Sequence, residues 1–578
     1  MEHKLSRICD GILEAGWLAA IVATPLFFNI HSARVFEPDK LTLLRSIAVI
    51  MAVAWLVKFV NDRGWEEIGW LKPRGPESIW AMPFVLPVFL VAVVYLLSTV
   101  FSIVPGVSWA GSYQRLQGTY TTLSYIVVFS LMAATIRRRE QVSRVVTTAI
   151  ISSIPVSLYA MLQHFGLDPL PWGGDVQSRV AGHMGNSIFI AAYIIMITPL
   201  TLARIVDAFT NILGDEELAL ADVVRSSIYI FALAIQLLAI FWTQSRGPFL
   251  GLAVGLYAFV LIMLVTLRNA ESSERVDDDG YGAVFGVSEA GKAAGLVFLG
   301  TVIPLLVATV LLPESTAPLS SFAVFLGAVG LQVLVILILA LARRGWRWLW
   351  LSWILVAVLM AGFLGVFNFS DDLQAGLEEA PLVGDSLETV VSWRQLPQIG
   401  RFGQLLESGR GSGRVRVLIW EGALDLIAPH EPLETPFGEE DPFNFLRPVF
   451  GYGPESMYVA YNRFYQPELA TIEARNASPD RAHNETFDAL VITGWAGLLA
   501  WQFLYLTVFY YAFRWLGVVR SAGDRNVLIG LWVGGAVLGG ALIVALLGMP
   551  FFGVALPFGA IVGLVVYLIY YAIVAGTA

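Results

Sequence analysis

The chain has 578 residues, of which 57% are hydrophobic and 14% are charged, and its mean hydropathy is +0.70. Soluble domains carry about 25% charged residues, so this composition excludes an ordinary soluble protein and predicts an integral membrane protein. The single cysteine, Cys9, excludes an intrachain disulfide framework and a cysteine-based zinc or iron–sulfur site. The formal charge is −9, from 45 acidic and 36 basic residues.

Apolar runs of about 17 to 25 residues, long enough to cross a bilayer as helices, recur along the chain. They predict an all-α polytopic membrane protein with fourteen transmembrane helices and one large extracytoplasmic loop that contains short helices. A second run follows the first closely and no small-residue cleavage site separates them, so the first is not expected to be a cleaved signal. The predicted spans are 11–30, 41–60, 79–103, 119–136, 145–165, 184–203, 226–243, 248–267, 293–312, 319–342, 346–368, 487–513, 526–548 and 550–575.

Lysine and arginine set the expected orientation, because short cytoplasmic connections are enriched in them. With the N-terminus inside, the inner segments hold 21 of these residues and the short outer connections hold six. Both termini are therefore expected in the cytoplasm. The expected domains are 1–368 with eleven spans, an outer loop at 369–486, and 487–578 with three spans. The loop carries 19 acidic and 9 basic residues, so its charge is −10 and the remainder of the chain carries +1.

Arg246 is the first candidate for chemistry. It lies in WTQSRGPFLGL (242–252), where a few polar residues separate two apolar runs at the outer boundary. One interpretation is an interfacial arginine that reaches out to water. The other is an anion clamp, in which the guanidinium and the positive end of the following helix bind phosphate together.

The segment GSGRVRVLIWEGALDLI (411–427) is predicted to form an amphipathic helix in the outer loop. Arg416 and Trp420 are four residues apart, so the indole is expected to stack on the guanidinium and hold it. A surface helix that covers the loop's own core or the membrane is the alternative. Two arginines, Arg414 and Arg416, in a strongly acidic loop favour a functional role.

His483 directly precedes the twelfth predicted span, in RAHNETFDALVITGWAGLLAW (481–501). A lone histidine at the start of a helix is more often a capping or hydrogen-bonding residue than a base. However, Arg246, Arg416 and His483 are all expected on the outer side, near the lipid boundary. This combination suits a lipid-anchored anionic substrate that meets a neutral base.

Two outer connections carry further polar groups: Arg115 lies in GSYQRLQGTY (111–120), and Arg179 and Asn186 lie in RVAGHMGNSIFIAAY (179–193). Aromatic and amide groups there could contact sugars, although tyrosine at a membrane interface is ordinary in itself.

Metal and nucleotide chemistry have little support in the sequence. Glu37 and Asp39 in FEPDK (36–40) could form a metal pair, but no further acidic partner is evident. The acidic run ESSERVDDDG (271–280) is expected to be a solvated linker. No P-loop, dinucleotide fingerprint, HExxH or GxSxG motif occurs, so neither a cofactor nor a metal is expected.

Together these motifs resemble the O-antigen ligase and polymerase superfamily, which includes the pilin-type O-oligosaccharyltransferases. The resemblance rests on SRG before a span, SGRVRVLIW (412–420), GYGPESM (451–457) and HNETFDALVITGWAGLL (483–499), in that order. It covers residues 90 to 510. The chain departs from the family in having fourteen predicted spans where about twelve are common, and GNS at 185–187 where GNP is frequent.

The resemblance implies a GT-C-like membrane glycosyltransferase of the plasma membrane that serves cell-envelope polysaccharide or lipopolysaccharide biosynthesis. It would move a glycan from an undecaprenyl or other polyprenyl diphosphate carrier to an acceptor hydroxyl, with inversion and without a metal. Arg246 and Arg416 would bind the diphosphate, Arg414 is an alternative to Arg416, and His483 would act on the acceptor hydroxyl. Further candidate contacts with the donor or acceptor are Arg115, Arg179, Asn186, Arg481 and Asn484.

A flippase or exporter of lipid-linked glycans is the alternative from another class. A transporter is expected to carry charges inside several spans, whereas here the spans are clean and the polar residues gather at their outer ends. The sequence does not specify the sugars, the carrier length, the oligomeric state or the acceptor, which could be a lipid A core, a repeat unit or a protein hydroxyl.

Overall fold

The computed structural model describes residues 2–64, 82–214, 220–274, 287–308, 318–341, 346–377, 389–390, 392–396, 400–404, 411–473 and 477–574. In this part of the chain every regular element is a helix, as predicted, and the strand-like pairing is one isolated bridge between Glu434 and Glu440. The chain divides into two compact units, each described by itself below. The first comprises residues 1–148 and 408–571, and the second comprises 149–407 and 572–578.

Ten helices in the described ranges are long and apolar enough to cross a membrane, which confirms the multi-pass architecture. The other four predicted spans, at 79–103, 119–136, 293–312 and 319–342, coincide with apolar helical stretches of 10–17 residues, so a count of fourteen stays a prediction. The ten segments are Lys4–Leu26, Pro38–Asn61, Arg139–His164, Ser187–Phe209, Leu220–Thr243, Arg246–Val265, Trp348–Asn368, Glu485–Trp515, Ala522–Leu547 and Met549–Ala572.

The first unit begins with five helices, and α3 packs against both α5 and the long helix α19. The early helices are α1 (Glu2–Leu26), α2 (Pro38–Asn61), α3 (Val85–Val100), α4 (Pro105–Ala110) and α5 (Thr119–Thr135), followed by the start of α6 (Arg139–His164). The later ones are α15 (Gly411–Ile427), η8 (Asn444–Leu446), α16 (Arg447–Phe450), α17 (Met457–Ala460), η9 (Tyr461–Phe464), α18 (Leu469–Ile472), α19 (Glu485–Trp515), α20 (Ala522–Leu547), η10 (Met549–Phe551) and α21 (Phe552–Val574).

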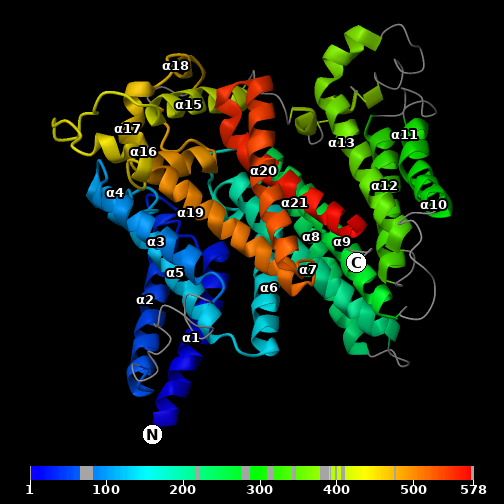
Figure 1. Cartoon of the computed structure of the whole chain (residues 1–578), viewed down its shortest axis with the longest axis horizontal. Helices are drawn as coiled ribbons and strands as arrows, with labels where there is room; N and C mark the ends of the chain where they lie inside the picture. Colours follow the sequence, from blue (N-terminus) through cyan, green and yellow to red (C-terminus); the bar gives the residue numbers. More distant parts are fainter. Residues whose placement is uncertain are drawn as a thin grey trace. The chain divides into compact units, whose positions relative to one another are not determined.

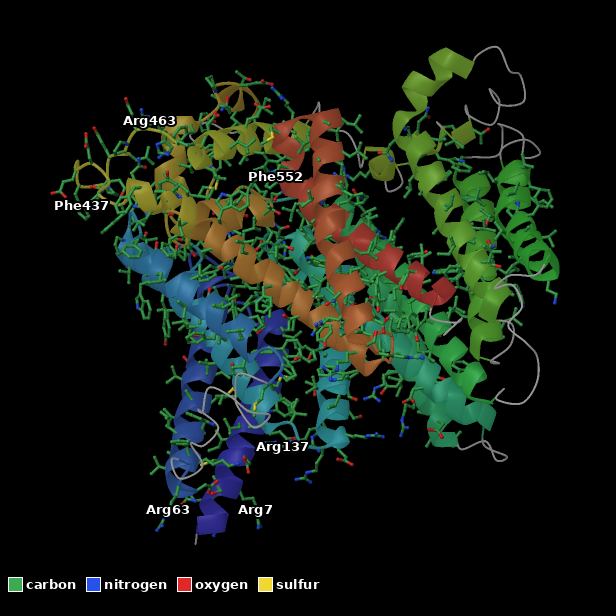
Figure 2. All side chains as sticks on the ribbon, in the orientation of Figure 1. Arg7, Arg63, Arg137, Phe437, Arg463 and Phe552 are labelled. Carbon is green, nitrogen blue, oxygen red and sulfur yellow. The ribbon has the colours of Figure 1, made fainter. Side chains whose placement is uncertain are left out.

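The two ends of this unit differ in character. The short helices α15 to α18 gather at one end, beside α4, and the N-terminus lies at the opposite end (Figure 1). Arg7, Arg63 and Arg137 lie toward the N-terminal end, whereas Phe437 and Arg463 lie among the short helices (Figure 2). The end that carries these three arginines is the one that the positive-inside rule predicts for the cytoplasm.

A glycine kink shapes α19 below the short helices. Gly494 has φ 65° and ψ −166°, which interrupts the helical hydrogen bonding. The carbonyls of Val491 and Ile492 accept hydrogen bonds instead from the amides of Tyr452 (2.8 Å) and Gly453 (3.0 Å). A Cβ at position 494 would lie 2.4 Å from the backbone of Val449. The kink therefore attaches the GYGPESM segment directly to the helix that follows His483.

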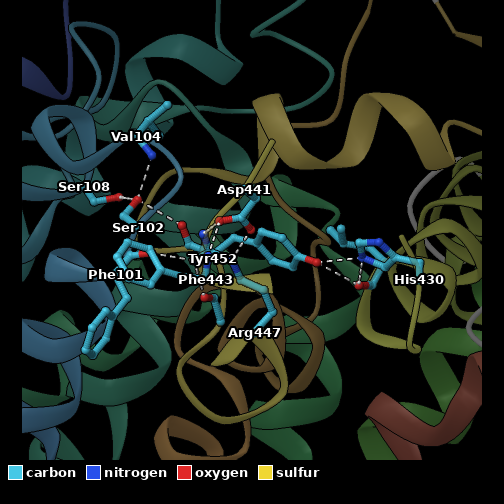
Figure 3. Close-up of polar contacts among 11 residues, drawn as sticks. Phe101, Ser102, Val104, Ser108, His430, Asp441, Phe443, Arg447 and Tyr452 are labelled. Carbon is cyan, nitrogen blue, oxygen red and sulfur yellow. Dashed lines mark hydrogen bonds and ion pairs between the residues drawn. The ribbon is translucent and has the colours of Figure 1, made fainter. Parts of the chain in front are cut away.

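A buried ion pair anchors the same segment (Figure 3). Arg447 donates from Nε and one terminal nitrogen to the two carboxylate oxygens of Asp441, at 2.7 and 2.6 Å, and the side chains are 4% and 1% exposed. Its other nitrogen donates to the carbonyls of Phe101 (2.6 Å) and Gly451 (3.0 Å). Because each of its three guanidinium nitrogens donates to a fixed partner, Arg447 joins the end of α3 to the GYGPESM segment.

The second unit contains most of α6 and the helices up to α13. Its helices include η3 (Gly182–Met184), α7 (Ser187–Gly214), α8 (Leu220–Thr243), α9 (Arg246–Glu274), α10 (Val287–Val297), the π-helix η4 (Phe298–Val302), α11 (Ile303–Leu306), α12 (Pro318–Leu341), α13 (Trp346–Leu377), η6 (Trp393–Gln395) and η7 (Gly400–Gln404). A buried amide on α8, Gln236, donates to Ser153 of α6 (2.8 Å) and Thr201 of α7 (3.0 Å) and joins the three helices.

Two predicted segments extend beyond the described residues. The acidic run at 271–280 begins as the last turn of α9, and its residues 275–280 lie outside them. In the predicted loop at 369–486, α13 continues to Leu377, and residues 378–388, 391, 397–399, 405–410 and 474–476 lie outside them. The loop as a whole therefore stays a prediction, although the amphipathic helix expected at 411–427 is present as α15.

Candidate active site

His483 lies between two residues that are fixed by hydrogen bonds. The buried Ala482 donates its amide to Asp488 Oδ1 (2.8 Å), and its carbonyl accepts the indole N–H of Trp420 (2.9 Å). On the other side, Asn484 caps α19 by accepting from the amides of Thr486 and Phe487 at 3.0 and 3.3 Å. The candidate base is therefore held by two helices, α15 and α19.

The backbone of His483 itself is strained. Its φ is 52°, in the left-handed region that costs energy for a residue with a Cβ. Such conformations persist where surrounding contacts impose them, and they gather at functional sites. Here the contacts to Ala482 and Asn484 impose it, and they present the side chain at an exposed position.

The surroundings of His483 favour the neutral imidazole. Desolvation by nearby protein atoms lowers its pKa from the usual value, and the positive charges of Arg416, Arg115 and Arg481 lower it further. The carboxylate of Asp480 opposes them. Because a lowered pKa keeps the ring unprotonated at neutral pH, His483 is suited to accept a proton.

Arg416 and Arg414 both lie on α15 but have different environments. Arg416 is exposed, and within the described part of the chain its guanidinium makes no hydrogen bond or ion pair. Arg414 binds both carboxylate oxygens of Glu468, at 2.9 and 2.5 Å, and lies 3.7 Å from Glu421. The charge of Arg414 is thus neutralised by Glu468 and Glu421, whereas the guanidinium of Arg416 remains available to an anionic ligand.

The predicted stacking of Trp420 on Arg416 is wrong. Trp420 is 8% exposed, and its ring packs against Phe487 and Phe551 with centroids 6.1 and 6.0 Å away. The two residues are four apart, but the indole turns into the core because it is the larger apolar group, and the charged group stays in water. Trp420 therefore fixes the backbone beside His483 and does not hold the guanidinium.

Ion pairs hold Arg115 and a hydrogen bond holds Arg481, the other two basic candidates of this unit. Arg115 lies 3.5 Å from Glu37 and donates through Nε to Asp480. Arg481 donates to the side chain of Gln117. These contacts join connections between helices that are distant in sequence, so Arg115 and Arg481 are placed to shape the site and to add positive charge to it.

Glu455 was missed by the sequence argument. Its carboxylate accepts the amides of Ser112 (2.5 Å) and Gln117, so it fixes the connection that carries Arg115. The only signal for it in the sequence is its place in GYGPESM, the motif on which the resemblance partly rests.

Glu37 and Asp39, the two acids considered as a metal pair, have other partners. Glu37 pairs with Arg115, and Asp39 accepts a hydrogen bond from Asn29 (2.6 Å). Among the described residues there is no group of three or more histidine, cysteine or acidic side chains suited to a metal ion.

Arg246 belongs to the second unit, where it begins α9 after a turn at Gln244 and Ser245. Arg179 donates to the carbonyl of Thr243 (3.1 Å) and the hydroxyl of Ser245 (3.4 Å). Arg401 donates to the carbonyl of Gln244 (3.3 Å). Two guanidinium groups, those of Arg179 and Arg401, therefore contact the turn directly before Arg246, and the start of a helix is a location that is favourable for anions.

Asn186 has a structural role in the same unit. It directly precedes α7, and its side chain accepts the amide of Ile188 at 2.8 Å. It thereby caps the first turn of that helix.

Comparison with known families supports the sequence resemblance. Residues 317–502 match the family described as O-antigen ligase, and this range includes α15, the GYGPESM segment and His483. The chain matches no curated protein and no solved structure. Through residues 317–502 the chain carries the sequence features of the O-antigen ligase family, and its resemblance to the O-antigen ligase and polymerase superfamily is confirmed.

Proposed function

We propose that this chain transfers a glycan from an undecaprenyl or other polyprenyl diphosphate carrier to an acceptor hydroxyl on the outer face of the plasma membrane. The matched family supports the broader class, a glycosyltransferase of the O-antigen ligase or polymerase type. The finer proposal rests on His483, whose neighbours Ala482 and Asn484 are held by hydrogen bonds, whose pKa is lowered and which lies within the electrostatic influence of the exposed Arg416.

His483 is the general base in this proposal. The neutral ring nitrogen takes the proton of the acceptor hydroxyl while the hydroxyl oxygen bonds to the anomeric carbon of the donor sugar. The bond from that carbon to the carrier diphosphate breaks, and the electron pair leaves with the diphosphate. A single displacement of this kind inverts the anomeric configuration.

Arg416 stabilises the leaving group. Charge develops on the diphosphate as the glycosidic bond breaks, and a guanidinium donates to phosphate oxygens in a fixed fork geometry. Arg414 keeps the role of an alternative, but its two bonds to Glu468 would have to be exchanged for bonds to phosphate. The proposal assigns the charge stabilisation to arginine and requires no metal.

The remaining candidates receive roles according to their own surroundings. Arg246 is assigned to the diphosphate through the sequence resemblance, and its place at the start of α9 suits an anion. Arg179, beside that turn, is a candidate donor contact. Arg115 and Arg481 position the site and lower the pKa of His483. Asn484 and Asn186 act as helix caps.

The orientation is part of the proposal. Arg7, Arg63 and Arg137 lie at the end of the first unit opposite the short helices (Figure 2), which supports a cytoplasmic N-terminus and a site on the outer side. A cysteine introduced at the exposed Phe437 should react with a membrane-impermeant reagent in intact cells. Reaction only after permeabilisation would contradict the orientation.

The activity is tested with purified protein, a polyprenyl diphosphate-linked glycan and a set of acceptors, with EDTA present throughout. Transfer should proceed in EDTA. His483→Ala should lower it about 10²- to 10⁴-fold, the usual contribution of a general base. Arg416→Ala should lower it about 10²- to 10³-fold, as expected for loss of a charge-stabilising donor.

Matched variants control for the loss of a histidine or an arginine as such. His31 is exposed and Arg463 forms an exposed ion pair with Glu431, so His31→Ala and Arg463→Ala should retain transfer. Full transfer by His483→Ala would refute the catalytic assignment, and loss of wild-type transfer in EDTA would refute the metal-free mechanism.

A further inference from the structure

A cavity of about 680 Å³ lies within the first unit, along α3, α5 and α19. Most of its wall is apolar and is formed by Val88, Val91, Ile126, Phe129, Leu504 and Val508. The lining residues come from α3, α5 and α19, and α3 packs against both of the other helices. The cavity is therefore a mainly apolar groove between helices.

The groove is open along its side. Tyr125 and Phe129 of α5 are 47% and 45% exposed, and Tyr505 and Val508 of α19 are 41% and 43% exposed. Residues 485–515 form one of the membrane-length helices, and α3 and α5 are shorter apolar helices. A hydrocarbon chain in the bilayer can therefore enter this groove laterally.

One end of the groove is polar and mainly acidic. It is lined by Gln117, Glu455, Asp480, Arg481, Glu485 and Asp488, which together carry four carboxylates and one guanidinium. Arg481 and Glu485 lie two residues before and two residues after His483. The polar end thus lies beside the proposed base.

Glu485 is the carboxylate at this end that remains available to a ligand. Glu455 accepts backbone amides, Asp480 accepts from Arg115, and Asp488 accepts the amide of Ala482. Glu485 is exposed, and in the described ranges it makes no hydrogen bond or ion pair. A carboxylate accepts hydrogen bonds from sugar hydroxyls and repels a phosphate.

From these features we propose that the groove binds the acceptor and that the acceptor is a lipid-anchored glycan with an uncharged headgroup. This inference rests on the proposed function, because it requires His483 to act on the acceptor. The apolar length holds a hydrocarbon chain, and the acidic end holds hydroxyl groups beside His483. If the acceptor were a protein hydroxyl, the apolar part of the groove would have no ligand. If it were a diphosphate carrier, its phosphates would lie against the carboxylates at the polar end of the groove.

The test uses two photoreactive lipids with the same acyl chains, each with a diazirine in one chain. One carries a neutral glucosyl headgroup, and the other is a phosphatidic acid. The full-length protein is reconstituted in phosphatidylcholine nanodiscs with each probe, and the labelled peptides are identified by mass spectrometry. The glucosyl lipid should label peptides of α3, α5 and α19, and the phosphatidic acid should label them less.

Variants of α5 and α19 test occupancy and charge separately. Thr122 lines the groove, so Thr122→Trp places a large side chain in it and displaces part of the lipid chain. Loss of the burial of two methylenes is enough to weaken lipid binding, and therefore labelling, about tenfold. Ser130 is exposed on the same helix and does not line the groove, so Ser130→Trp should label as the wild type does. Glu485→Gln should increase labelling by the phosphatidic acid. Equal labelling by both lipids, or labelling that Thr122→Trp does not reduce, would overturn the inference.

His483→Ala separates this inference from the proposed function. The variant should lose transfer and retain groove labelling. If it retains transfer, the proposed function fails while the labelling result still stands. If it loses transfer but the wild-type groove is not labelled by the glucosyl lipid, the inference about the acceptor fails alone.

Discussion

Trp420→Phe tests whether the backbone beside His483 must be fixed. The substitution keeps an aromatic ring near Phe487 and Phe551 but removes the indole N–H that donates to the carbonyl of Ala482 at 2.9 Å. Ala482 is fully buried and Trp420 is 8% exposed, so no water replaces the lost donor readily. An unpaired buried carbonyl costs about 1–3 kcal/mol.

The effect on the transfer rate depends on how much of this free-energy cost changes the geometry of His483. If it falls on the geometry of His483 in the transition state, kcat/KM for transfer should decrease about 5- to 150-fold, since 1.36 kcal/mol corresponds to tenfold. Trp495 is 44% exposed on α19 and offers a matched control, because Trp495→Phe leaves the contacts of Ala482 intact. A Trp420→Phe variant with wild-type kcat/KM and an unchanged pH profile would refute the positioning role.

Three further predictions concern stability and pH. Arg447→Leu leaves the buried carboxylate of Asp441 without its partner and should destabilise the protein by about 3–5 kcal/mol. The double variant with leucine at positions 441 and 447 should lose less stability. Thermal unfolding in detergent measures both variants, and an equal loss of stability in the two would contradict the pairing. Gly494→Ala should lower thermal stability, because φ is 65° and the added Cβ would meet the Val449 backbone. The positive charge of Arg416 lowers the pKa of His483, so Arg416→Ala should move the acidic limb of the pH profile of its remaining kcat/KM to higher pH. Arg416→Lys keeps the charge and should leave that limb at its wild-type pH. Movement of the limb to lower pH in Arg416→Ala would contradict the direction of the pKa shift.

The helical architecture could be predicted because its signal is local. Apolar runs of membrane length recur in the sequence, and ten of them are helices of that length in the described residues. The start of α19 was equally accessible, since Asn484 before an apolar run is a typical helix cap. The helices α3 and α5 show the limit of this approach, because an apolar loop such as 101–104 extends a run without extending its helix.

The contacts within the candidate site could not be predicted because they join distant parts of the chain. Spacing placed Arg416 and Trp420 on one side of α15, but the partners of Trp420 lie at 482, 487 and 551. In the sequence, the four-residue spacing from Trp420 favours Arg416 over Arg414. The structure supports the same preference for another reason, the pairing of Arg414 with Glu468, 54 residues away. The contact of Arg115 with Asp480 spans 365 residues and left no local signal.

The central claim is that the imidazole of His483 accepts the proton of the acceptor hydroxyl, and chemical rescue tests it most directly. Glycine adopts the observed φ of 52° without strain, so His483→Gly removes the imidazole while the backbone conformation is kept. The side chain is exposed, which allows a small molecule to reach its place. Transfer by His483→Gly should be lost and should be restored by added imidazoles, with a rate that rises with the pKa of the imidazole. Undiminished transfer by His483→Gly, or a rescue rate independent of that pKa, would contradict the account.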